Sequence, residues 1–172
     1  MSAGAREHSG GTAGTLAGTI VLAAWLGAAL YFSVVVAQAA FRVLPSRALA
    51  GALVGQTLPA LFITGFAAGV AAALLAAREP RAAWARMGRL LGSAGAALAC
   101  GIGQFVIGPR IDRLRLAIGD RLESLPASDP LRAAFGRLHG LSVLALGAAI
   151  ILALTVVVLG GRRIALSAGT RD

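Results

Sequence analysis

Four long stretches of this chain contain no acidic residue and no arginine, and they constrain its fold more than any other feature. They cover residues 15–41, 48–77, 90–109 and 138–161. A helix needs roughly 20 predominantly apolar residues to cross the hydrocarbon core of a bilayer. Inside lipid the backbone polar groups must be satisfied within the segment, which favours helices. The sequence therefore predicts an all-α integral membrane protein, a four-transmembrane-helix bundle.

The composition supports a membrane location. Only 13% of the residues are charged and the mean hydropathy is +0.81, whereas a soluble domain is about 25% charged. All 16 basic residues are arginine, and the abundance of Ala, Gly and Leu is typical of a GC-rich bacterial coding sequence. The formal net charge of +9 does not indicate nucleic-acid binding, because the arginines flank the apolar stretches. We expect a multi-pass protein of a bacterial plasma membrane.

The chain divides into a disordered tail at 1–14, one membrane domain at 15–161 and a C-terminal tail at 162–172. Four spans place both termini on the same side, and the dense arginines between the second and third spans favour cytoplasmic termini. Pro59 predicts a kink in the second span. Pro109, directly after Gly108, predicts the end of the third span.

The loop at 110–137 is the longest segment outside the predicted spans. Its apolar residues follow helical spacing and share one face: Ile111, Leu114, Ile118, Leu122 and Leu125. This pattern predicts an amphipathic interfacial helix in the headgroup region, or a helix that caps the end of the bundle through the same stripe. Ser128 or Asp129 is expected to cap a helix leading into the fourth span.

Small residues are expected to hold the spans together, since helices in lipid associate by close packing rather than by the hydrophobic effect. Pairs of glycines four residues apart occur in several places, Gly136 and Gly140 among them. We interpret them as support for a compact bundle.

Polar residues at membrane depth are the best candidates for a site, because an unpaired polar group in hydrocarbon is costly. Helix alternation brings one set of them to a single end of the bundle. This candidate polar site comprises Gln38, Gln56, Gln104, Arg110, Asp112, His139 and Ser142. The alternative interpretation is structural, with the three amides joining helices and His139 bonded to Ser142 or to a loop carbonyl.

Several kinds of chemistry find no support in the sequence. Every acidic residue lies outside the predicted spans, which disfavours proton coupling through intramembrane carboxylates: Glu7, Glu79, Asp112, Asp120, Glu123, Asp129 and Asp172. Cys100 is the single cysteine and is expected to be a small buried hydrophobe. We find no catalytic motif, so we expect no enzymatic activity, no cofactor and no metal.

A series of short motifs resembles the transmembrane protein 205-like family over about residues 18–160. The resemblance implies a four-span protein whose bacterial members are described as a domain of unknown function. The family often has an asparagine seven residues after the His, where this chain has Leu146. The motifs are Trp25-x-Gly27, Phe41-Arg42-Val43-Leu44-Pro45, Leu58-Pro59-Ala60-Leu61-Phe62, Gly108-Pro109-Arg110 and Phe135-x-x-x-His139-Gly140-Leu141-Ser142.

The sequence thus favours a non-enzymatic structural or interaction protein of the bilayer. Its expected partners are lipid, a second copy of the chain or another membrane subunit. The alternative is a small-solute or metal-related transporter, or an accessory subunit of one, with the candidate polar site lining an entry.

Overall fold

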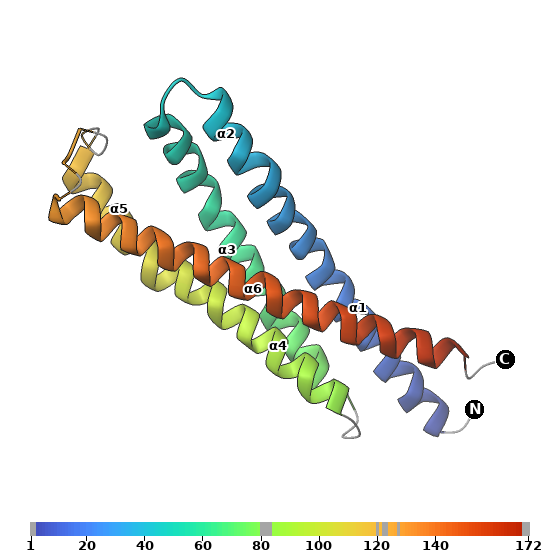
Figure 1. Cartoon of the computed structure of the whole chain (residues 1–172). Helices are drawn as coiled ribbons and strands as arrows, with labels where there is room; N and C mark the ends of the chain where they lie inside the picture. The colour runs from blue at the N-terminus through green and yellow to red at the C-terminus, as the bar shows by residue number, and fades with distance from the viewer. Residues whose placement is uncertain (1–2, 80–83, 120, 122–123, 127, 170–172) are drawn as a thin grey trace.

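The computed structural model describes residues 3–79, 84–119, 121, 124–126 and 128–169, with side chains from residue 13 to residue 166. The described part is helical and contains no strand. Four of its helices are long and apolar enough to cross a membrane: Ala13–Val43, Arg47–Ala77, Trp84–Ile118 and Pro130–Leu166. Figure 1 shows them as an elongated bundle, with the start of α1 and the end of α6 at the same end. The four-helix membrane fold predicted from the sequence is confirmed.

The first span is one continuous helix built from three segments. α1 covers Ala3–Tyr31, a π-helical segment η1 covers Phe32–Val36, and α2 covers Ala37–Val43. Helix therefore starts at Ala3, within the segment 1–14 that was expected to be a disordered tail. The candidate membrane span itself begins at Ala13.

The second span is α3, which covers Arg47–Ala77. Ser46 caps it, because its hydroxyl oxygen accepts a hydrogen bond from the backbone N–H of Leu49 at 3.2 Å. The helix continues on both sides of Pro59. A proline inside a helix leaves the carbonyl four residues earlier without its partner, here that of Gly55.

The third span continues past the position where Pro109 was predicted to end it. α4 covers Trp84–Gly101, the π-helical segment η2 covers Ile102–Ile107, and α5 covers Gly108–Ile118. The prediction of a stop was wrong because the helix runs directly from η2 through Pro109 into α5. A proline inside a helix removes one hydrogen bond, and here, as at Pro59 in α3, the helix continues. The side chain of Arg110 also donates to the carbonyl oxygen of Val106, at 2.6 Å.

The fourth span is α6, which covers Pro130–Gly169. Asp129 caps it, as expected, by accepting a hydrogen bond from the backbone N–H of Leu131 at 2.8 Å. Helix reaches Gly169, so most of the predicted tail at 162–172 belongs to α6.

A separate interfacial helix between spans three and four is not confirmed. The first half of the predicted amphipathic stripe belongs to α5, which is continuous with the third span and packs against α6. Within it Ile111 and Leu114 are half-buried and Ile118 is buried. Leu125 lies in the loop between α5 and α6, whereas Leu122 lies outside the described residues.

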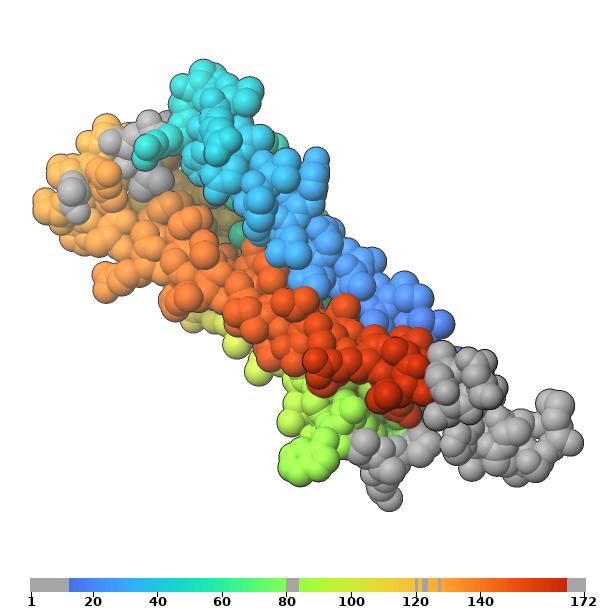
Figure 2. Space-filling model, turned by 45° about the vertical axis from the view of Figure 1, so that its right-hand side comes forward, coloured from blue at the N-terminus to red at the C-terminus, as the bar shows by residue number. Residues whose placement is uncertain are grey.

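The spans pack in a ring in which α1 contacts α3, α3 contacts α4, α4 contacts α6, and α6 contacts α1. The space-filling view in Figure 2 shows α1 and α6 running along one face of this bundle. The shared core is apolar and draws mainly on these helices: Leu22, Trp25, Leu26, Ala29, Phe32, Leu61, Phe62, Ala68, Ala72, Cys100, Ala149, Ala153 and Val156.

Close approach of the helices depends on glycine. At Gly69 an added Cβ would lie 2.8 Å from the backbone nitrogen of Ala97 and 2.9 Å from the carbonyl oxygen of Ser93. At Gly65 it would lie 2.5 Å from the indole of Trp25. That indole donates a hydrogen bond to the carbonyl oxygen of Leu61 at 2.9 Å. Glycine thus lets the backbones of α3 and α4 meet and seats Trp25 on α3.

We predict that Gly69→Ala lowers the free energy of unfolding by about 1–3 kcal/mol, the usual cost of overpacking. The backbones of α3 and α4 would have to separate to admit the methyl group. Unfolding by denaturing detergent, followed by circular dichroism, measures the change.

Gly27→Ala is the matched control, because Gly27 is exposed and an added Cβ there meets nothing within 4 Å. This variant is expected to retain or slightly exceed the stability of the parent. Equal destabilisation in both variants would contradict the packing described for Gly69.

Candidate functional site

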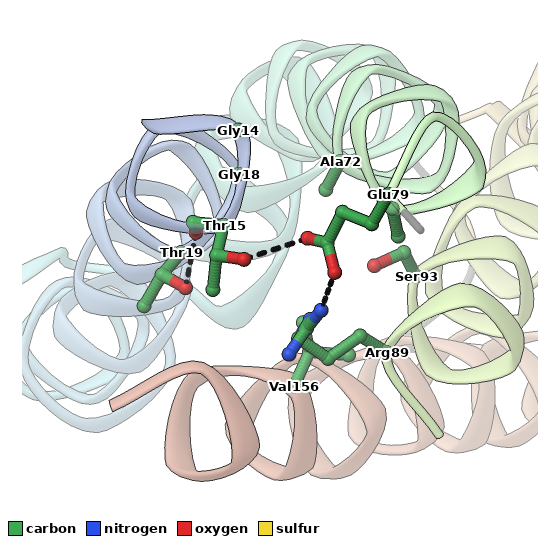
Figure 3. Close-up of a pocket in the computed structure, with 10 residues that line it drawn as sticks. Gly14, Thr15, Gly18, Thr19, Ala72, Glu79, Arg89, Ser93 and Val156 are labelled. Carbon is green, nitrogen blue, oxygen red and sulfur yellow. Dashed lines mark hydrogen bonds and ion pairs between the residues drawn. The ribbon is translucent and has the colours of Figure 1, made fainter. Parts of the chain in front are cut away.

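The most densely connected polar residue in the described part of the chain is Glu79, in the turn after α3. Its side chain is only 2% exposed. Figure 3 shows its carboxylate pointing into the space between the helices, toward Thr15 and Arg89. Because Thr15 lies on α1, Arg89 on α4 and Arg163 on α6, all four spans meet at this carboxylate.

The two carboxylate oxygens of Glu79 have different partners. Oε1 accepts a hydrogen bond from the hydroxyl of Thr15 at 2.7 Å. Oε2 accepts hydrogen bonds from both guanidinium groups, through Nη2 of Arg89 and Nη1 of Arg163. We call Thr15, Glu79, Arg89 and Arg163 the carboxylate cluster. Charge-assisted bonds of this kind are the stronger ones in proteins, and here the acceptor and Arg89 are both buried.

The turn between α3 and α4 is built to hold Glu79 in place. Its backbone N–H donates to the carbonyl oxygen of Ala76 at 3.3 Å. Arg86 of α4 reaches back to the end of α3 and donates to the carbonyl oxygens of Ala76 and Ala77, at 3.1 and 2.9 Å. A cation at a helix C-terminus satisfies unpaired carbonyls and complements the helix dipole. The arginines of this turn therefore make specific contacts in addition to flanking the membrane.

A small cavity adjoins the carboxylate cluster. Its empty volume is about 200 Å³, which includes space open to solvent. Small residues of α1 and α3 form part of its wall, among them Gly14, Gly18 and Ala72. Arg89 and Ser93 line it from α4 (Figure 3).

Two buried polar atoms beside this cavity make no hydrogen bond. They are Nη1 of Arg89 and Oγ of Ser93, on side chains that are 3% and 0% exposed. Leaving a buried donor without an acceptor costs about 1–3 kcal/mol, and more for a charged group. Most native polar groups avoid this cost, so the pair distinguishes the cavity from ordinary packing.

The described part of the chain does not gather the donor groups that a metal site requires. Over the residues that the structure describes, no three His, Cys, Asp or Glu side chains lie close enough to hold a metal ion together. Cys100 is fully buried in the core, as expected from the sequence.

The candidate polar site predicted from the sequence lies at the opposite end of the bundle, where Figure 1 shows α2 with the start of α3 and α5 with the start of α6. Ser142 is buried, Gln104 is half-buried within η2, and the others are exposed. In the part of the chain that the structure describes, no hydrogen bond or ion pair joins any two of the seven. The exposed five are Gln38, Gln56, Arg110, Asp112 and His139.

His139 and Arg110 each contact a residue four positions earlier in the same membrane span. The imidazole of His139 stacks on Phe135 with the ring planes at 3° and the centroids 6.4 Å apart. Arg110 bonds to Val106, as described above. Leu146, where the resembling family often has asparagine, packs against the core. A functional role for the candidate polar site remains a prediction.

Arg115 links α5 to both α3 and α6 at this end of the bundle. Its Nη2 donates to the carbonyl oxygen of Gly51 on α3 at 3.0 Å, and its guanidinium lies 5.8 Å from the ring centre of Phe135 on α6. An added Cβ at Gly55 would collide with the same guanidinium. Glycine at this position therefore lets Arg115 lie against α3, one turn before Pro59.

Sequence reasoning missed the carboxylate cluster because it treated every acidic residue as external to the spans. A signal was present, since Glu79 is the single acidic residue between the second and third spans and arginines surround it. An acid placed there among Arg78, Arg81, Arg86 and Arg89 has more cations nearby than a solvated loop requires.

Comparison with known proteins identifies a family. A family model described as a domain of unknown function, DUF4149, matches residues 20–119, which is more than half of the chain. The chain belongs to the DUF4149 family. No curated protein and no solved structure matches it.

The DUF4149 match covers most of the first span and the whole of the second and third. Glu79, Arg89 and Ser93 lie inside the matched segment, whereas Thr15 and Arg163 lie outside it. The family description assigns no activity.

We predict that Glu79→Ala lowers the free energy of unfolding by about 3–5 kcal/mol, because it leaves the guanidinium of Arg89 buried without its counter-charge. Detergent-induced unfolding measured by circular dichroism provides the value. Asp112→Ala is the control, since Asp112 is exposed and surface changes usually stay within about 0.5 kcal/mol. A loss of less than 1 kcal/mol in Glu79→Ala would contradict the structural weight given to the cluster.

At the other end, Arg115→Met is expected to lower the free energy of unfolding by about 1.5–3 kcal/mol, the range for a hydrogen bond that involves a charged group. Methionine retains an apolar stem but cannot donate to Gly51. Arg113→Met, on the same helix and exposed, should change stability far less. Indistinguishable unfolding curves for the two variants would show that Arg115 does not join α5 to α3.

Proposed function

We propose that this DUF4149 protein is a non-enzymatic interaction protein of the bilayer, of transmembrane protein 205-like type, that works by associating with a second copy of itself. The supporting observation is an uncovered face on α6. This helix is the most apolar of the four spans, with a mean hydropathy of 2.8 in its best window, and only 22% of that window is buried.

The uncovered face of α6 carries glycine. An added Cβ at Gly136, Gly140 or Gly147 would meet nothing within 4 Å. Leu144 and Ile151 lie at helical spacing on the same side and are 69% and 66% exposed. Spacings of three and four residues place all five on one face. We call this set the α6 glycine face.

Several other glycines of the spans meet a neighbour, whereas a few, such as Gly27 and Gly161, are also open. The contrast with the packed glycines supports the proposal. Gly69 faces the backbone of α4, Gly92 faces Val156, and Gly103 faces the ring of Phe62. In lipid, glycines four residues apart let two helices approach closely. Where the fold uses this device internally a neighbour fills the space, whereas on the α6 glycine face the space is open.

The proposal includes a location and an orientation. We place the protein in a bacterial plasma membrane with both termini cytoplasmic, since the short connection between α3 and α4 is dense in arginine. Labelling of single cysteines at exposed Arg78 and Arg113 with a membrane-impermeant reagent in intact cells tests it. Labelling at residue 113 and none at residue 78 is expected.

A transport or transporter-accessory role is the second candidate, and one observation favours it. Gln104 lies half-buried in η2, and π-helical segments occur frequently at functional sites. Under this alternative, His139→Ala would abolish binding of a solute without changing the unfolding curve.

Native mass spectrometry of protein released in mild detergent tests the leading proposal. We predict a dimer for the parent and a monomer for Gly140→Ile, because a branched side chain would hold the two α6 helices apart. Gly161→Ile is the matched control on the same helix, at an exposed glycine that also lacks neighbours.

This control should remain dimeric. A monomeric parent that carries a stoichiometric non-lipid ligand would instead favour the transport alternative. Dissociation of both variants would show that the α6 glycine face is not the interface.

A further inference from the structure

We propose that the cavity beside the carboxylate cluster is a binding site for one monatomic anion, chloride being the abundant choice, held by Nη1 of Arg89 and Oγ of Ser93. This inference goes beyond the proposed association and does not depend on the α6 glycine face.

The first support is the chemistry of the two unpartnered atoms. A guanidinium nitrogen can donate a hydrogen bond and cannot accept one, so Nη1 of Arg89 requires an acceptor. The hydroxyl of Ser93 can also donate, and it lies four residues along α4, on the same face of the helix. Both side chains are at least nine-tenths buried and line the cavity. A ligand that accepts from both would satisfy them together.

The second support is the distribution of charge. The carboxylate of Glu79 is shared, since its Oε2 accepts from Arg89 and from Arg163 while its Oε1 accepts from Thr15. Arg89 therefore receives only part of a counter-charge through Nη2, and its Nη1 has no acceptor. Glu79 also lines the cavity, but its single negative charge faces two guanidinium groups, so the net positive charge favours an anion over a neutral ligand.

The third support is size. The cavity has room for about one water-sized particle. A site of this size favours a monatomic anion over phosphate, sulfate or a carboxylate. The wall beside it consists partly of Gly14, Gly18 and Ala72, which place no bulky side chain in the cavity.

Exchange with solvent has a short route. The cavity lies at the end of the bundle, and Arg163, which shares Oε2 with Arg89, is 31% exposed. A bound anion would lie at the point where α1, α3, α4 and α6 already converge, so binding to the folded protein should stabilise it.

The test is a thermal melt of the purified full chain in detergent, with sodium chloride replacing sodium gluconate at constant ionic strength. We expect the Tm to rise with chloride and to saturate, because gluconate is too large to enter. In Ser93→Ala the chloride concentration at half-saturation should increase about tenfold, the effect of losing one hydrogen bond to a charged partner.

Ser142→Ala is the matched control. Ser142 is equally a buried serine in a membrane helix, but it lies on α6 and does not line the cavity. Its half-saturation should equal that of the parent. A Tm that follows chloride and gluconate identically in the parent would overturn the proposal, as would an unchanged half-saturation in Ser93→Ala.

A second measurement does not depend on any variant. Crystals grown in sodium bromide should show an anomalous scattering peak in the cavity, within hydrogen-bond distance of Nη1 of Arg89 and Oγ of Ser93. A water molecule without anomalous signal at that position would overturn the proposal and assign the cavity to a structural water.

Discussion

The bundle depends on one shared carboxylate. Glu79 follows the second span directly, and its partners come from the other three, so a single acidic side chain joins all four membrane helices. Helices in lipid lack a hydrophobic driving force toward one another, which increases the weight of each specific polar contact. The arrangement also fixes the short turn after α3, where Arg86 covers the last carbonyls of that helix.

The two ends of the molecule are held together by different contacts. At the end with the termini, ion pairs and small residues bring the helices close. At the opposite end, Arg115 reaches from α5 to the backbone of α3 and lies over Phe135 of α6. Between them the core is filled by Trp25, Phe62 and alanines of facing helices. The α6 glycine face is the part of this apolar surface that the fold leaves without a neighbour.

The four spans could be predicted from the sequence because hydropathy over about 20 residues depends only on composition. The end of the third span could not be predicted from the sequence. Pro109 directly follows a π-helical segment, and residue spacing does not indicate where such a segment occurs. The same difficulty affects Gln38, which follows η1: faces counted at 3.6 residues per turn shift across a π-turn. The role of Glu79 could not be predicted, because a search for charge-free stretches places every acidic residue outside the spans. The burial of Glu79 depends on Thr15 and Arg163, which are 64 and 84 residues away in sequence.

The most direct test of the central claim is the distance between α1 and α4, two helices that Glu79 joins through Thr15 and Arg89. Spin labels at Leu16 and Leu91, both exposed, can be measured by pulsed electron resonance in lipid nanodiscs, with Cys100 replaced by alanine. The account predicts one narrow distance distribution that broadens markedly in Glu79→Ala and stays narrow in Asp112→Ala. An equally narrow distribution in Glu79→Ala would contradict it.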